Sequence, residues 1–203
     1  MRRRLAAGNW KMNGSVATSL AEVEALMVAH PSPLVDVLVC PPATLLAALD
    51  RKKARHPLAL GGQDCSPEAA GAFTETLSER EAGRTLDVVG GQLDGSVPEG
   101  VAGADLVVAY EPVWAIGTGL TPTTAQIAEV HGALRARLSA RMGAEGASVR
   151  LLYGGSVKGS NAAGIFAVAD VDGALVGGAS LRASDFSPII AALEQAAARD
   201  VDP

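Results

Sequence analysis

The chain has 203 residues, 48% apolar and 19% charged, which is long enough for one folded domain and excludes a disordered chain. Its formal net charge is −5 and the sequence carries no basic stripe, so we expect no nucleic-acid partner. No stretch reaches the ~18 apolar residues that a membrane-spanning helix needs, so we expect no membrane partner.

The two cysteines, Cys40 and Cys65, belong to no disulfide or metal-binding pattern, so we expect reduced thiols in a cytoplasmic protein. The basic residues 2–4 mimic the start of a secretion signal. Polar residues from Asn9 to Asn13 interrupt the apolar run that follows, so we reject that interpretation.

Short apolar runs alternate with longer amphipathic runs along the whole chain. The short runs are almost continuously Val, Leu and Ala, which is typical of strands buried on both faces of a parallel sheet. They predict six strands, at residues 4–9, 35–40, 58–62, 105–111, 149–153 and 173–177.

The amphipathic runs predict the helices that connect these strands. We expect Ser15 to cap the first, Thr44 the second, and Thr121 with Pro122 to begin the fourth, after a third at residues 80–93. Ser160 with Asn161, and then Asp185, would begin the last two. Residues 63–78 form a connection too long for a bare strand–helix loop.

Strand and helix therefore alternate through a single predicted domain, residues 1–203, with no linker. This order fits either an open doubly wound sheet or a closed (β/α) barrel. Polar and glycine-rich residues follow the predicted strands directly. Both architectures place active sites at that end of the strands.

Two glycine-rich turns follow the last two predicted strands, at residues 153–156 (Tyr-Gly-Gly-Ser) and 176–180 (Val-Gly-Gly-Ala-Ser). Backbone amides in such turns can approach an anion closely, and barrels often bind phosphate at this place. Either turn alone is more often an ordinary tight turn. Ser160 stands where a P-loop needs lysine, so we exclude nucleotide binding by that motif.

Two charged residues also follow strands. Glu111 ends an apolar strand, where partial desolvation would raise the pKa of its carboxylate and make it a better base. The residues that follow, 112–119, begin with a stiff Pro-Val-Trp stretch and end in a flexible one, which suits a lid. Lys11 offers a positive charge to a phosphate or a developing enolate oxygen, and Asn9 can shape the same loop. The alternatives are a surface ion pair for Glu111 and a solvated side chain for Lys11.

Four segments together resemble the signature segments of the triosephosphate isomerase family, in the family's order: residues 9–13, 110–119, 153–156 and 175–180. The resemblance implies an α/β, TIM-barrel-type (β/α) fold. It implies an isomerase that interconverts dihydroxyacetone phosphate and glyceraldehyde 3-phosphate through an enediolate, in glycolysis and gluconeogenesis. A triose phosphate would be its small-molecule partner, and neither a metal nor a cofactor would be needed.

The same resemblance implies a role for each site residue. Glu111 would be the base, Lys11 the electrophilic cation and Asn9 a substrate-site residue. Residues 115–118 would form the closing lid. The phosphate would be held largely through backbone amides, at Gly117, Ser156, Gly177 and Gly178.

The chain departs from the family in its middle. The family's catalytic histidine segment, Gly-His-Ser-Glu-Arg, is absent, and His30, His56 and His131 fall where surface or core positions are expected. A block is missing at the junction of Thr74 and Glu75, corresponding to the end of the third unit, the fourth unit and the fifth strand. Eight-unit barrels need ~250 residues, so we expect an incomplete barrel of about six parallel strands instead of eight.

This gap leads us to expect weak or absent turnover, and the alternative is an inactive phosphate-ligand-binding relic or scaffold. A third possibility is a histidine supplied by a partner subunit. The strands at 58–62 and 105–111 would be exposed edges, which invite association. We therefore expect a homodimer or a higher homo-oligomer, with the loop at residues 63–74 as one possible contact.

Overall fold

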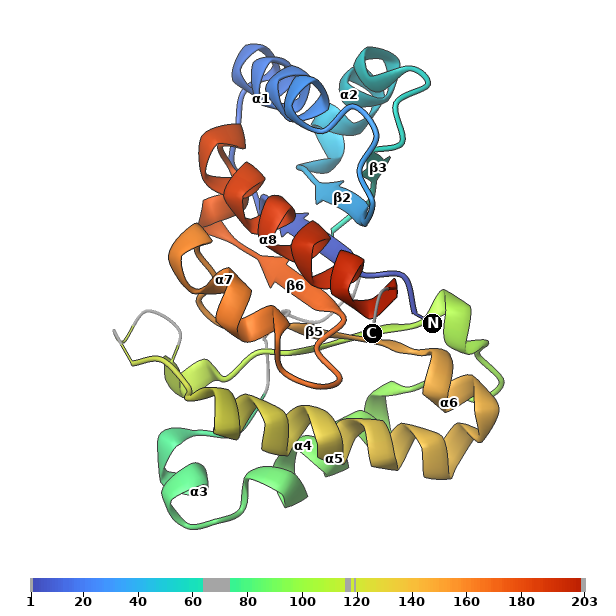
Figure 1. Ribbon diagram of the computed structural model, residues 1–203, viewed down its shortest axis with the longest axis vertical. Helices are drawn as coiled ribbons and strands as arrows, with labels where there is room; N and C mark the ends of the chain where they lie inside the picture. Colours follow the sequence, from blue (N-terminus) through green and yellow to red (C-terminus); the bar gives the residue numbers. More distant parts are fainter. Residues whose placement is uncertain (1, 64–73, 116–117, 119, 202–203) are drawn as a thin grey trace. The chain divides into compact units, whose positions relative to one another are not determined.

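The computed structural model describes residues 2–63, 74–115, 118 and 120–201, and Figure 1 shows the course of the chain. The chain divides into two compact units, each built from segments far apart in sequence. The first, here called the β4 unit, comprises residues 1–2, 71–156 and 164–174. The second, the β1 unit, comprises residues 3–70, 157–163 and 175–203. The prediction of a single domain stays a prediction.

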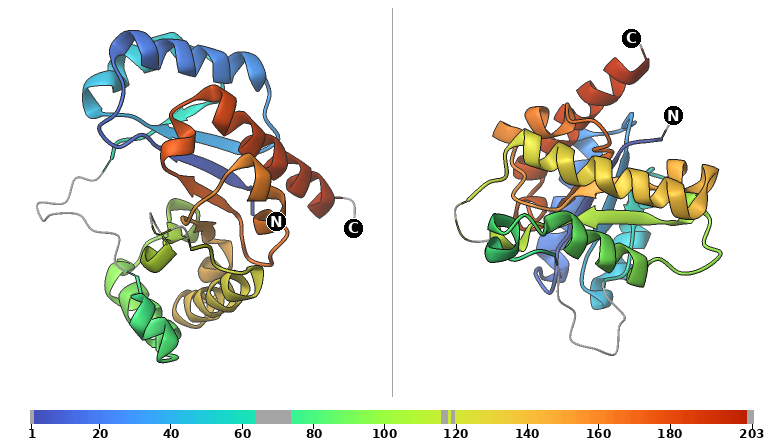
Figure 2. Two further views of the ribbon diagram at one scale, coloured as in Figure 1. Left: turned by 90° about the vertical axis from the view of Figure 1, so that its left-hand side faces the viewer. Right: turned by 90° about the horizontal axis from the view of Figure 1, so that it is seen from below.

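The β1 unit contains the first three strands and the helices packed around them. In chain order its elements are β1 (Leu5–Asn9), α1 (Val16–Ala29), β2 (Asp36–Cys40), η1 (Ala43–Leu45), α2 (Leu46–Lys53), β3 (Ala59–Leu60), η4 (Gly178–Ser180) and α8 (Ala183–Val201). β1 pairs in parallel with β2, and β2 with β3. α1 packs against α2 and α8, and Figure 2 shows it running alongside the strands.

The β4 unit contains the middle of the chain. Its elements are α3 (Leu77–Glu81), α4 (Thr85–Ser96), η2 (Gly103–Asp105), β4 (Val107–Tyr110), η3 (Val113–Ala115), α5 (Thr124–Met142), α6 (Ala144–Ser148) and β5 (Arg150–Tyr153). α5 packs against α4, α6 and β5, and α4 and α5 lie side by side in Figure 2. α7 (Gly159–Phe166) and β6 (Gly173–Val176) each contribute residues to both units.

The six strands belong to one sheet, in the order β3-β2-β1-β6-β5-β4. β4 pairs in parallel with β5, and β5 with β6. All six predicted strands are present, and the prediction of a TIM-barrel-type α/β fold with six parallel strands is confirmed. The order leaves β3 and β4 as the two edges of the sheet.

Several helix starts differ from the predictions, because the local backbone path decides which side chain can accept a hydrogen bond from a free amide of the first turn. Ser15 caps α1 as predicted. α2 begins at Leu46 without a side-chain cap, so the prediction for Thr44 was wrong. α5 begins at Thr124, with Thr123 rather than Thr121 as its cap.

The predicted third helix, at residues 80–93, is two helices. α3 has an unpredicted capping box between Thr76 and Glu79. Gly83, with φ of 71°, lies between α3 and α4. α7 begins at Gly159 and α8 at Ala183, slightly before the predicted starts.

An ion-pair network holds the amino-terminal ends of β5 and β6. Asp172 accepts a hydrogen bond from the backbone amide of Leu151 and lies 3.0 Å from Arg135. Arg135 also contacts Asp170 at 2.9 Å, and Arg2 lies within 3.0 Å of both aspartates. These contacts fix the end of the strands opposite to the predicted site residues. None of the described helices is both long enough and apolar enough to span a bilayer.

Candidate active site

The loop after β1 holds Lys11 in an unusual backbone conformation. Lys11 has φ of 51°, in the left-handed region that non-glycine residues rarely adopt. The side-chain oxygen of Asn9 accepts a hydrogen bond from the Lys11 backbone amide at 2.8 Å, and the side-chain amide of Gln63 donates to the Lys11 carbonyl. Such conformations cost ~1–3 kcal/mol and persist where the surroundings hold them, often at functional sites. The Lys11 side chain is exposed.

Trp10 joins this loop to the turn that follows β6. Its side chain is buried, and its indole nitrogen donates to the carbonyl of Ser180 at 2.8 Å. Its own amide donates to the Cys40 carbonyl at 3.0 Å. A Cβ at Gly8 would lie 2.8 Å from the Cβ of Ser180, so glycine is needed for this close packing.

The turn after β6 presents its backbone to open space. The Ser180 amide and hydroxyl both donate to the Gly177 carbonyl, at 2.8 and 2.7 Å, which fixes the turn. A Cβ built at Gly177 or at Gly178 would meet no atom of the described residues within 4 Å. An anion can therefore approach these amides closely. The β1 unit thus gathers Asn9 and Lys11 with Gly177 and Gly178 on two adjoining segments.

Glu111 follows β4 in the other unit, and its half-buried side chain lies over Gly154. A Cβ at Gly154 would stand 2.4 Å from Cγ and 3.2 Å from Oε1 of Glu111, so only glycine leaves room for this side chain. The Gly154 amide donates to the Tyr110 carbonyl at 2.8 Å. The Thr74 hydroxyl donates to the Glu111 carbonyl and accepts from the Val113 amide, which fixes the backbone on either side.

Ser156 ends the turn that carries Gly154. Its side chain is exposed, and a Cβ at the intervening Gly155 would lie 2.1 Å from the hydroxyl of Tyr153. Burial raises the pKa of Tyr153 to about 12, so this phenol stays neutral. The β4 unit therefore brings Glu111 and Ser156 onto neighbouring segments.

Sequence reasoning missed Glu75, which supports the segment around Glu111. Glu75 is fully buried and accepts hydrogen bonds from the Tyr110 hydroxyl at 2.7 Å and the Trp114 indole at 2.9 Å. Arg80 lies 3.7 Å away. Burial, and then the Glu75 carboxylate, raise the pKa of Tyr110 well above its ordinary value, which keeps its hydroxyl a donor. The Thr-Glu-Thr stretch looks like a polar loop, so the sequence gives no signal of this burial.

Part of the predicted site lies outside the described residues, namely Gly117 and the middle of the lid. At the ends of the lid, Ala115 is buried, and the Thr118 hydroxyl donates to the Trp114 carbonyl at 2.9 Å. Cys65 and most of the connection at residues 63–78 also lie outside them.

The three histidines make structural contacts. His30 lies 3.7 Å from Glu194, and His56 accepts a hydrogen bond from the Leu58 amide. His131 is fully buried within α5, where its Nδ1 lies 3.0 Å from the Asp170 carbonyl. Burial lowers the pKa of His131.

A sequence model described as triosephosphate isomerase matches this chain over residues 4–76 and 74–193. Triosephosphate isomerase from Ruegeria pomeroyi is 50% identical over 251 positions, covering 97% of this chain and 100% of that protein. The Jannaschia sp. enzyme is 47% identical over 249 positions, covering 97% and 100%.

A solved structure agrees with these sequence matches. The crystal structure of triosephosphate isomerase from Bartonella henselae matches with a TM-score of 0.82 and 34% identity, covering 94% of this chain and 98% of that one. The sequence model spans well over half of the chain, and the relatives share nearly half of its residues or more. The chain therefore belongs to the triosephosphate isomerase family.

Proposed function

We propose that this chain interconverts dihydroxyacetone phosphate and glyceraldehyde 3-phosphate by moving a proton between adjacent carbons through an enediolate. The observation that carries the proposal is the placement of Glu111 at the end of β4, with its side chain over Gly154 and its backbone held by Thr74. A base that transfers a carbon-bound proton needs such a fixed position. Family membership supplies the substrate class.

The remaining residues divide the work as follows. Glu111 removes the proton from one carbon and returns it to the other. The Lys11 ammonium stabilises the negative charge that develops on the enediolate oxygen. Asn9 holds the Lys11 loop through the hydrogen bond to its amide. The amides at Ser156, Gly177, Gly178 and Gly117 bind the phosphate. No step in this scheme requires a metal or a cofactor.

We further propose that the end of the family's third unit, its fourth unit and its fifth strand are missing from this chain. The two matched segments of the family meet at residues 74–76, and the alignment with the Ruegeria pomeroyi enzyme runs over 251 positions, more than the 203 residues here. The missing block includes the family's histidine. Loss of one donor to a developing oxyanion costs ~10²–10³ in rate, so turnover is weak.

A second candidate function is an inactive protein that still binds a phosphate ligand. It is favoured because all three histidines make contacts typical of structural side chains. The phosphate-binding turn at Gly177 and Gly178 serves both functions equally.

A coupled assay of the purified chain tests the proposed reaction. We expect slow turnover that disappears in Glu111→Gln, whose shape is conserved but which has no basic carboxylate. Equal turnover in both proteins would show a contaminating enzyme and would overturn the proposal. If neither protein turns over, calorimetry with a phosphoglycolate-like enediolate mimic decides: binding that Lys11→Met weakens supports the second candidate, and absence of binding contradicts both.

We also propose that the protein is cytoplasmic and self-associates as a homodimer or a higher homo-oligomer. Burial raises the pKa of the free thiol Cys40, so little of the reactive thiolate forms there. Self-association would cover the free edges of the sheet, β3 and β4.

A further inference from the structure

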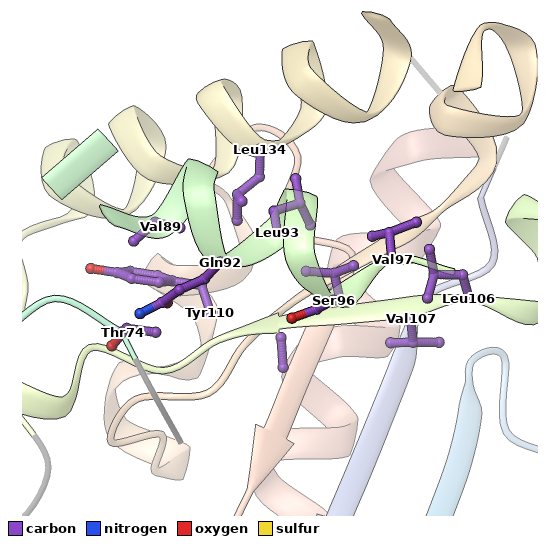
Figure 3. A pocket seen from close by; sticks show the side chains of 12 residues that line it. Thr74, Val89, Gln92, Leu93, Ser96, Val97, Leu106, Val107, Tyr110 and Leu134 are labelled. Atoms are coloured by element: carbon purple, nitrogen blue, oxygen red, sulfur yellow. The ribbon is translucent and has the colours of Figure 1, made fainter. Parts of the chain in front are cut away.

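A cavity lies along the free edge of β4. It has a volume of about 290 Å³, and its apolar walls come from α4, α5 and β4. Figure 3 shows Val89 and Leu93 of α4 and Leu134 of α5 above the strand, with Tyr110 and Thr74 at one end and Leu106 and Val107 at the other. A strand edge beside an apolar groove is a typical binding place for another extended chain.

The ladder with β5 shows which backbone groups of β4 face the groove. The Gly154 amide donates to the Tyr110 carbonyl, so Tyr110 and Val108 direct their backbone groups toward β5. Residues alternate between the two sides of a parallel strand, so Val107 and Ala109 direct theirs to the free edge. Thr74 already occupies the next carbonyl on that edge, that of Glu111. With respect to the described residues, the open stretch of β4 therefore runs from Val107 to Ala109.

β3, at the opposite edge of the sheet, offers matching groups on a strand of two residues. The Gly61 amide donates to the Val39 carbonyl at 3.0 Å, so Ala59 and Gly61 face β2 and Leu60 faces the free edge. Placed opposite Val108, Leu60 would donate its amide to the Val107 carbonyl and accept from the Ala109 amide. Two of the four open backbone groups of β4, the Val107 carbonyl and the Ala109 amide, are then satisfied by the two-residue strand β3.

The charges beside the two edges are opposite. Glu99 and Asp105 lie in the connection between α4 and β4, where Asp105 precedes the groove residue Leu106, and both are exposed. Arg51 and Arg55, also exposed, precede β3. Among the described residues, none of these four side chains forms an ion pair. In the parallel register above, Asp105 lies opposite Pro57, within side-chain reach of Arg55 at ~3.3 Å per residue.

We propose that the groove of one copy of this chain receives β3 of a second copy, with Leu60 opposite Val108 and Arg55 near Asp105. A twofold axis parallel to the paired strands keeps β3 of one copy parallel to β4 of the other. The proposal deepens the self-association proposed above, and it does not depend on isomerase activity. Its tests use no substrate. The proposed dimer can therefore be contradicted while the proposed reaction is supported, and the proposed reaction can be contradicted while the dimer is supported.

Cysteine cross-linking tests the register and the identity of the occupant. In a background with Cys40→Ser and Cys65→Ser, Leu60→Cys combined with Val108→Cys should give a disulfide-linked dimer on mild oxidation, because opposed residues meet disulfide distance limits. A control pair, Leu60→Cys with Leu120→Cys, should not cross-link efficiently. A cross-linked monomer would show that β3 of the same chain fills the groove and would overturn the proposal. No cross-link above the control would overturn it as well.

Charge reversal provides an independent test by analytical ultracentrifugation. Arg55→Glu and Asp105→Arg should each raise the dimer dissociation constant by about 10- to 100-fold. The double variant should restore association, because the opposite charges are exchanged. Arg199→Glu, on the exposed last turn of α8, controls for the change in net charge. A monomeric wild type, or equal association of all variants, would contradict the proposal.

Discussion

The indole of Trp114 donates a hydrogen bond to the carboxylate of Glu75 at 2.9 Å, across 39 positions of sequence. Tyr110 donates to the same oxygen at 2.7 Å. Tyr110 and Trp114 stand on either side of Glu111, so one buried carboxylate holds both flanks of the proposed base. The region where the two family matches meet thus positions Glu111.

The hydrogen bonds to Glu75 can be measured one at a time. Trp114→Phe and Tyr110→Phe each remove one donor from a buried charge, and each should lower the free energy of unfolding by ~1–3 kcal/mol. Denaturant titration gives the values. Tyr153→Phe is the matched control, because the Tyr153 hydroxyl has no hydrogen bond to another described residue. An effect of Tyr153→Phe as large as the other two would contradict a specific role for Glu75.

Gly154→Ala should displace the Glu111 side chain, because its Cβ would stand 2.4 Å from Cγ of Glu111. A displacement of ~1 Å at a reacting group can cost ~10² in rate, so kcat should fall by about that factor. Gly132→Ala lies in α5, where an added Cβ would meet none of the described atoms within 4 Å, so this variant should leave kcat unchanged. Activity in Gly154→Ala equal to that of the wild type would show that Glu111 does not need its position over Gly154.

Acid should destabilise the fold through His131. Its pKa is lowered in the folded state, so below the ordinary value of 6.5 the unfolded chain binds a proton that the folded chain does not. The contribution of His131 is complete above pH 6.5 and is lost as the pH falls toward the folded-state pKa, at up to ~1.4 kcal/mol per pH unit.

Denaturant titrations between pH 7.5 and 5.5 measure this slope in the wild type and in His131→Asn. Glu79 and Asp94 have lowered pKa values too, but they exchange protons below their ordinary values of 4.5 and 3.8. The slope should therefore be smaller in His131→Asn. An unchanged slope would exclude His131 as its source.

The helix caps distinguish structure from sequence. Thr123 caps α5 by accepting from the Gln126 amide, so Thr123→Ala should lower the free energy of unfolding by ~1 kcal/mol. Thr121→Ala, at the position that the sequence favours, should change it by less than ~0.5 kcal/mol. Thermal unfolding of both variants measures the difference, and the reverse order would contradict the cap assignment.

The sequence alone was enough to predict all six strands and the family, because both depend on local information. A strand buried on two faces must be continuously apolar, and the family's segments are short and contiguous. The helix starts depend on more than local sequence. Thr121 and Thr123 are equally good caps by type, and only the backbone path decides which hydroxyl reaches a free amide.

The surroundings of Glu111 depend on tertiary structure. Glu75 and Gly154 lie far from it in sequence, and neither residue type announces its role: a glutamate in a polar loop and a glycine in a tight turn are both common. The sequence does not predict the groove beside β4 either. An apolar residue gives the same sequence pattern whether a neighbouring strand covers it or not. The sequence determined which residues can do the chemistry. Packing between distant segments decided which of their side chains are fixed in position, which are buried and which remain exposed.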